Sequence, residues 1–228
     1  MLSSSLARTH LFSARELAAL LVLSILIPGC AHYKARPLDS GQSASSVIDQ
    51  REAEGLYFAV KDISQSVNSA RYFDRDLVEA GYVPVLVLAE LDRDSNAVFD
   101  LRREDLQLCL QDGTRLLTAD PARVSEDVAF SHVRSTLGFL LILPGFFLAS
   151  SVSHANEELE NDYRSKALES LRINPNARSF QGVVFFSLPE ERRATFSMEE
   201  AFVEARLYMG GAADSVGKAL EFPVHFGD

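Results

Sequence analysis

Tryptophan is absent from this 228-residue chain, and cysteine occurs only at positions 30 and 109. Two cysteines cannot build the disulfide framework that supports many small secreted domains. No His-x-x-His, Cys-x-x-Cys or His-Glu-x-x-His spacing occurs, so the usual metal-site patterns are missing. The Gly-x-Ser-x-Gly elbow of hydrolases is missing as well. We therefore expect a protein that is not an enzyme and binds no cofactor.

Basic residues are also fewer than acidic residues. The 22 Lys and Arg residues face 32 Asp and Glu residues, which gives a formal net charge of -10. Binding to nucleic acid needs clustered basic residues that displace counterions from phosphates, whereas the basic residues here are scattered among more numerous acids. We expect no nucleic-acid partner, and the same imbalance disfavours adsorption to anionic lipid head groups.

The first 29 residues have the anatomy of a secretory signal peptide. A positively charged region containing Arg8 and Arg15 precedes an apolar run from Leu17 to Ile27. As a helix this run would span about 17 Å, against the ~30 Å of a bilayer's hydrocarbon core. An uncleaved membrane anchor is therefore the poorer interpretation, and we expect residues 1–29 to be removed.

The motif Ile27-Pro28-Gly29-Cys30, directly after the apolar run, resembles the lipobox of bacterial lipoproteins. The resemblance implies that the Cys30 thiol accepts a diacylglycerol and that Cys30 becomes the mature N-terminus. Ala31 stands where lipoproteins kept in the inner membrane usually carry Asp, so the resemblance also implies attachment to the outer membrane, on its periplasmic face. Residues 30–51 contain Ser, Gly and Gln and predict a flexible tether.

Short runs of alternating apolar and polar residues recur from residue 52 onward. This alternation is typical of half-buried strands, and Asp112-Gly113 between two such runs is a strong hairpin signal. The run 181–188 is apolar on both faces, so we expect it to be the most buried strand. Without regular strand–helix alternation, the pattern predicts a mainly β fold, an antiparallel sandwich over residues 52–228. The expected strands are Leu56–Val60, Val85–Leu91, Ala97–Leu101, Leu106–Leu110, Thr114–Thr118, Gln181–Leu188, Val203–Met209 and Leu220–Phe226.

An excursion of the chain from about residue 121 to residue 176 is too long for an ordinary sandwich loop. Pro121 suits the first turn of a helix over 121–136, and apolar residues recur at helical spacing from Val152 to Leu171. Between these predicted helices, Leu137–Ala149 is uncharged, is broken by Pro144-Gly145 and is too short to span a bilayer. We expect an inserted apolar and helical hairpin.

Three interpretations of this apolar hairpin stay open. It is buried against the sandwich, it dips into a membrane or mediates self-association, or it covers an apolar ligand. Under the second interpretation, the residues that contact the membrane or a partner are Phe139, Leu140, Leu141, Ile142, Phe146 and Phe147.

Two segments that look functional have plainer explanations. Asp92–Asn96 begins like a calcium loop, but Ala97 and Arg103 replace the Gly and Glu of such a loop, so we expect a charged turn. Cys109 lies in an alternating run without the cationic neighbourhood that activates a thiol, and we expect a half-buried structural thiol. A hydrolase site would need ionisable groups from distant residues to converge in one pocket.

Four segments together resemble a family of uncharacterised bacterial envelope lipoproteins: Gly55–Ile63, Tyr72–Leu77, Gly81–Val85 and Arg178–Phe186. The Asp-Gly hairpin, followed downstream by the sequence GVVFF at 182–186, also resembles immunoglobulin-like domains of secreted bacterial proteins. The resemblance covers most of residues 52–228 and implies an immunoglobulin-like sandwich, although such domains lack the apolar insertion.

The resemblance carries no catalytic residues. It implies a lipid-anchored, non-catalytic binding or structural module whose partner is another envelope protein or a second copy of this chain. The alternative is a membrane-contacting or self-associating lipoprotein that acts through residues 137–149.

Overall fold

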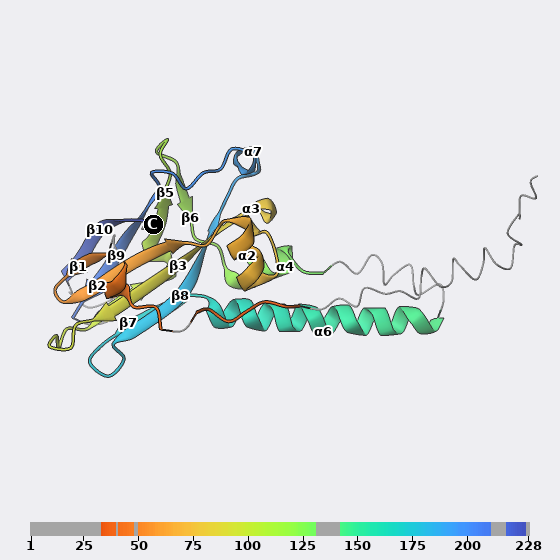
Figure 1. Ribbon diagram of the computed structural model, residues 1–228, viewed down its shortest axis with the longest axis horizontal. Coiled ribbons are helices and arrows are strands. Elements are labelled where there is room, and N and C mark those ends of the chain that lie inside the picture. The colour runs from red at the N-terminus through yellow and green to blue at the C-terminus, as the bar shows by residue number, and fades with distance from the viewer. Residues whose placement is uncertain (1–32, 40, 48–49, 131–141, 211–217, 227–228) are drawn as a thin grey trace, which may run out of the picture. The chain divides into compact units, whose positions relative to one another are not determined.

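The computed structural model describes residues 33–39, 41–47, 50–130, 142–210 and 218–226 (Figure 1). The chain divides into two compact units, one made of residues 1–32 and 130–155, the other of residues 33–129 and 156–228. Of the first unit, the described part is Phe130 and the helical stretch 142–155. The second unit, called the β unit below, contains all the strands that the structure describes.

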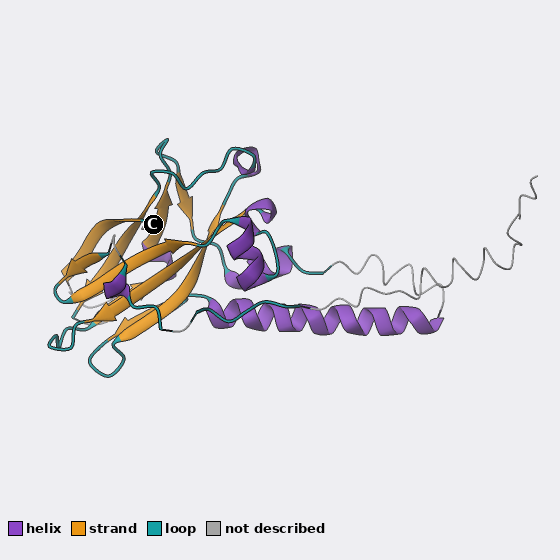
Figure 2. Ribbon diagram, viewed as in Figure 1, coloured by secondary structure: helices purple, strands orange, loops and turns teal. Residues whose placement is uncertain are grey.

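One sheet of the β unit has four antiparallel strands in the order β1-β2-β3-β8 (Figure 2). β3 is central because it pairs with β2 on one side and with β8 on the other. The strands are β1 (Arg51–Ala53), β2 (Leu56–Asp62), β3 (Tyr82–Leu91) and β8 (Ser179–Ser187).

The second sheet is built around β9 (Phe202–Met209). β10 (Lys218–His225) pairs with one edge of β9, while β5 (Leu106–Cys109) and β4 (Phe99–Arg102) pair in turn with the other edge. The 3-10 turn η2 (Arg103–Asp105) separates β4 from β5. β6 (Arg115–Leu117) pairs with β5 in the predicted Asp-Gly hairpin, and β7 (Ser170–Ile173) pairs with β4. The fold is therefore mainly β with two antiparallel sheets, as the sequence predicts.

A continuous apolar core joins residues of both sheets. Val184 and Phe186 of β8 belong to this core, whereas Val183 and Phe185 alternate with them on the opposite face of the strand and are equally buried. The prediction that this strand is buried on both faces is confirmed. The prediction that it is the most buried strand is wrong, because β3 has strand neighbours on both edges and only Glu90 among its 10 residues is not buried.

The two sheets also meet at their edges. Thr118, just after β6, forms an antiparallel bridge with Phe186 of β8. Val60 of β2 forms a parallel bridge with Phe226, just after β10. These bridges pair backbone groups that an open sheet edge would leave free to bind another chain.

Short helices collect at the end of the sheet where β3 begins (Figure 2). Pro121 opens one of them, and the Asp120 side chain caps it by accepting the Ala122 N–H at 2.9 Å. Gly81 ends another with a φ of 95°, a left-handed conformation that favours glycine. The helices are α2 (Ser66–Phe73), α3 (Leu77–Ala80) and α4 (Pro121–Asp127). The remaining short elements of the β unit are η1 (Ala44–Ser46) and α7 (Glu190–Arg193).

The structure corrects the predicted insertion. The helix α6 (Ile142–Lys166) ends before Leu171, which lies in β7 and pairs with Leu101 of β4. Residues 170–173 alternate between exposed and buried. The apolar spacing alone is compatible with a helix or a strand, and the pairing with β4 makes this segment a strand. Pro144-Gly145 lies within α6 and does not break it, since proline is tolerated in a first helical turn. The first predicted helix is shorter than expected, ending at Asp127, and residues 131–141 lie outside the described part of the chain.

Candidate functional site

The structure does not describe the side chains of most residues that the sequence predicts to be functional. The predicted signal peptide, Cys30 and three hairpin residues, Phe139, Leu140 and Leu141, lie outside the described residues. Three more hairpin residues, Ile142, Phe146 and Phe147, lie in the first turns of α6, where the backbone alone is described. The candidate site is therefore the region of the β unit from which these segments leave.

The described chain begins with a contact to the β unit rather than with a free linker. The Tyr33 hydroxyl donates to the carboxylate of Asp162 in α6 at 2.6 Å. Burial and then this hydrogen bond raise the pKa of the Tyr33 hydroxyl, so it stays a donor at neutral pH. Asp162 also pairs with the ammonium group of Lys166, one helical turn later, at 2.5 Å.

Three residues further along, the chain is attached to α2. The Arg36 N–H donates to the Arg71 carbonyl at 3.0 Å. The Asp39 carboxylate accepts from the Tyr72 hydroxyl at 2.6 Å and pairs with Arg71 at 3.0 Å. These contacts and the Tyr33–Asp162 bond are called the N-terminal clamp.

The clamp argues against the prediction that residues 30–51 are a flexible tether throughout. Beyond the clamp, Ser43 donates to the Glu90 carboxylate of β3, and Ala44 and Val47 are buried. Within this range, the described residues thus pack on the β unit, although their Ser-rich composition predicts a tether. Tyr33, an aromatic residue close to the start of the predicted tether, was the available sequence signal for such packing.

Lys166 is the buried charge of the clamp. Its side chain is 5% exposed, its ammonium group donates to the Tyr72 carbonyl at 2.6 Å, and it lies 5.2 Å from the Phe73 ring centre. Burial lowers the pKa of Lys166, while Asp162 opposes that shift. The Asp162 carboxylate, the Tyr72 carbonyl and the Phe73 ring therefore stabilise the buried positive charge of Lys166.

An aromatic cluster lies under the clamp and joins three elements. Tyr163 of α6 stacks on Phe185 of β8 with ring centres 5.7 Å apart, and Phe73 of α2 lies 4.9 Å from Tyr163 and 5.4 Å from Phe185. Tyr33 extends the cluster, 6.5 Å from Tyr163. The outward face of β8 is thus buried by the same helices that hold the clamp.

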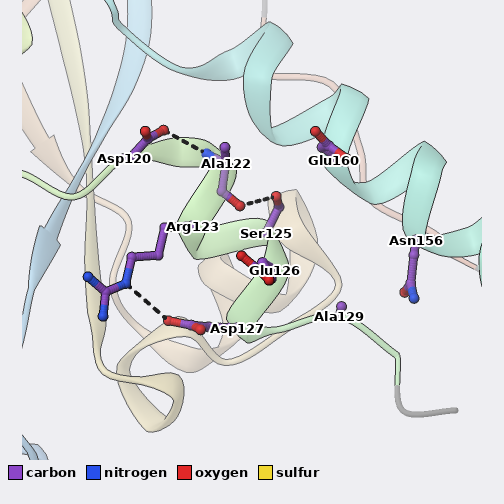
Figure 3. Close-up of a pocket in the computed structure, with 9 residues that line it drawn as sticks. All are labelled: Asp120, Ala122, Arg123, Ser125, Glu126, Asp127, Ala129, Asn156 and Glu160. Atoms are coloured by element: carbon purple, nitrogen blue, oxygen red, sulfur yellow. Dashed lines mark hydrogen bonds and ion pairs between the residues drawn. The ribbon is translucent and has the colours of Figure 1, made fainter.

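An open groove of about 770 Å³ lies between α4 and α6, beside these elements (Figure 3). Its lining residues are Asp120, Ala122, Arg123, Ser125, Glu126, Asp127, Ala129, Asn156 and Glu160. Four of them carry carboxylates and one carries a guanidinium group, so the groove is acidic and repels phosphate groups.

The groove does not assemble a catalytic arrangement from the residues drawn in Figure 3. The Ser125 hydroxyl donates to the Ala122 carbonyl at 2.7 Å, inside the helix. Asp120 caps α4, and Asp127 pairs with Arg123 and accepts from the Tyr82 hydroxyl. Among the described residues, no three His, Cys, Asp or Glu side chains are placed to hold a metal ion.

The other two candidate segments are structural. Asp92–Asn96 is a turn in which Asp92 accepts the Asp94 N–H, and the Arg178 side chain donates to the Asp92 carbonyl at 2.6 Å. Cys109 is 5% exposed in β5, and burial raises the pKa of its thiol. Both the charged turn and the structural thiol agree with the sequence predictions, although the thiol is more buried than expected.

The points where the β unit connects to the other unit all lie near one another. These points are Tyr33, Ala129 and Asn156. Ala129 and Asn156 line the same groove, and Tyr33 is bonded to Asp162, about 9 Å along α6 from Asn156. We call this region, with the N-terminal clamp and the groove, the clamp end of the β unit.

Among the described residues, no helix combines the length and the apolar character needed to cross a membrane. No protein-family model, curated protein or solved structure matches this chain. Any function must therefore be argued from the residues of this chain itself.

Proposed function

We propose that this chain is a bacterial lipoprotein, anchored through a lipid on Cys30 in the outer membrane and facing the periplasm. The β unit serves as a non-catalytic binding or structural module for an envelope protein or a second copy of the chain. The lipobox-like motif Ile27–Cys30 after an apolar run supports the anchor. The observation that carries the proposal is this motif, and the clamp adds that Tyr33 holds the chain on the β unit only three positions after Cys30.

We further propose that the β unit is an immunoglobulin-like sandwich, in line with the resemblance to envelope lipoproteins. In such a sandwich the strands A, B and E are neighbours in one sheet, and C, F and G are neighbours in the other, with C′ beside C. Here β2, β3 and β8 are neighbours in one sheet, and β5, β9 and β10 in the other, with β6 beside β5. Taken in chain order, these strands fill the places of A, B, C, C′, E, F and G, the insertion lies between C′ and E, and β4 and β7 are additions to this pattern.

The lipid anchor is tested by replacing Cys30 with serine. Cys30→Ser is expected to abolish incorporation of labelled palmitate and to leave an unprocessed precursor, because only the thiol accepts the diacylglycerol. The matched control is Cys109→Ser, which removes the other cysteine and leaves labelling intact. Labelled palmitate that still enters the Cys30→Ser protein would refute the assignment.

A second candidate function, membrane contact or self-association through residues 137–149, is favoured by where this segment leaves the β unit. Its flanking connections at Ala129 and Asn156 lie at the same end as Tyr33. A lipid on Cys30 and the apolar segment can therefore reach one membrane together, and two attachments hold better than one acyl chain.

This second function is tested in a chain that carries Cys30→Ala behind a signal peptide cleaved without lipidation. Contact through residues 137–149 is expected to keep that protein in the membrane fraction after carbonate extraction. Adding Leu141→Asp is expected to release it, since a buried unpaired charge costs several kcal/mol. Full release of the Cys30→Ala protein by itself would contradict this second function.

A further inference from the structure

We infer that the clamp end of the β unit rests on a phospholipid surface, where the exposed side chains of Lys34 and Arg36 contact anionic head groups. The opposite end, which carries the Asp92–Asn96 turn, then points away from the membrane. This inference rests on the proposed lipidation of Cys30.

The chain between the lipid and the clamp is short. Tyr33 comes three positions after Cys30, and an extended chain covers at most about 3.5 Å per residue. The backbone of Tyr33 therefore lies within ~10 Å of the lipid-bearing residue, and its hydroxyl is held by Asp162. A body tied this closely to a bilayer cannot tumble freely above it.

The strand β3 runs from the clamp end of the β unit to the opposite end. Tyr82, the first residue of β3, bonds to Asp127 of α4 at the clamp end, and Leu91, its last residue, leads into the Asp92–Asn96 turn (Figure 1). A strand of 10 residues covers about 33 Å. The short linker therefore holds the clamp end at the membrane, and in an upright orientation the Asp92–Asn96 turn lies about 33 Å farther from it.

The local charge of residues 34–36 favours contact with anionic head groups. Lys34 and Arg36 are exposed, and neither has an ion-pair partner among the described residues. The acidic residues of the clamp are occupied, because Asp39 pairs with Arg71 and Asp162 pairs with Lys166. Although the net charge of -10 opposes adsorption of the whole chain, the first residues after the anchor present two free cations to the head groups. Each basic residue near an anionic surface favours contact by about fivefold.

The acidic groove restricts which part of the clamp end can contact the lipid. Its carboxylates, among them Glu126 and Glu160, repel anionic head groups. We therefore expect the lipid to touch the part of the clamp end that carries residues 34–36 and the neighbouring Arg71 of α2. Val67 lies there, one helical turn before Arg71 and 80% exposed, and it provides an apolar position at which to measure contact.

The experiment uses the lipidated full chain in vesicles of phosphatidylcholine and phosphatidylglycerol that contain a phospholipid with a spin-labelled head group. A fluorophore is attached through Val67→Cys in one protein and through Asn96→Cys in a matched control, since Asn96 is exposed in the opposite turn. Cys109 is buried and stays unlabelled. We expect several-fold stronger quenching at position 67 than at position 96, and weaker quenching at position 67 in vesicles of phosphatidylcholine alone.

The variant Lys34→Gln/Arg36→Gln tests the two cations directly. It is expected to weaken the contact about 25-fold in anionic vesicles, and raised salt should mimic it by screening. Equal quenching at positions 67 and 96 in protein that carries labelled palmitate would overturn the inference and leave the lipid anchor in place. Unchanged quenching at position 67 in the double variant would overturn the role of the two cations. Protein without palmitate would instead refute the proposed function, and the inference would fail with it.

Discussion

Replacing Phe185 with alanine is expected to lower the free energy of unfolding by about 3–5 kcal/mol, the usual cost of deleting a buried aromatic side chain. Phe185 is 0% exposed, and its ring contacts those of Phe73 and Tyr163. No disulfide involving described residues offsets the loss, since Cys109 is free. Urea or thermal unfolding of the two proteins measures the difference.

The matched control for this prediction is Leu117→Ala, also in a strand but with 63% of the residue exposed. Its expected effect is within about 0.5 kcal/mol. A loss at Phe185 no larger than that of the control would mean that the contacts of β8 with α2 and α6 contribute little to stability.

Replacing Asp162 with asparagine is the second large effect. The change keeps an oxygen for the Tyr33 hydroxyl but removes the one carboxylate among the described residues that pairs with the buried Lys166. Breaking a buried ion pair from one side costs about 3–5 kcal/mol, and because Asp162 is partly exposed we expect about 2–3 kcal/mol. Tyr33→Phe is the control that removes the hydroxyl alone, with an expected loss of about 1 kcal/mol.

The Asp162→Asn deficit is expected to depend on pH in a defined direction. Burial already lowers the pKa of Lys166 below its usual 10.5 in the folded protein, and removing the carboxylate lowers it further. Between the folded pKa and 10.5 the unfolded chain binds more protons, so stability rises with pH there. The deficit should therefore be full at neutral pH and should shrink as pH approaches 10.5. A deficit that grows with pH would contradict the role of the Lys166 charge.

Local sequence signals predicted most strands of this protein. The Asp112-Gly113 hairpin and the alternation in β2, β9 and β10 depend on neighbouring residues, so the chain shows them without its fold. The end of α6 was mispredicted for a related reason. Leu171 fits the apolar spacing of a helix, and only its pairing with Leu101 of β4 identifies a strand.

Only part of the candidate site could be predicted from the sequence. Cys30 and the apolar segment 137–149 were identifiable from the chain because a lipobox-like motif and an uncharged run are contiguous patterns. Their side chains are not described in the structure, and their functions remain predictions. The clamp was not predicted at all, because the Ser, Gly and Gln residues within 30–51 are typical of a linker and nothing local indicates the partner of Tyr33.

By itself, the sequence determined the mainly β character, the hairpin and the buried strand β8, since alternation and turn chemistry act over a few residues. Only the tertiary structure decided that the chain just after Cys30 is held on α6 and α2. The Tyr33–Asp162 bond joins residues 129 positions apart, and only the folded chain brings them together. The physical reason is that the free energy of the clamp comes from burial and charge pairing between distant segments, which no local pattern encodes.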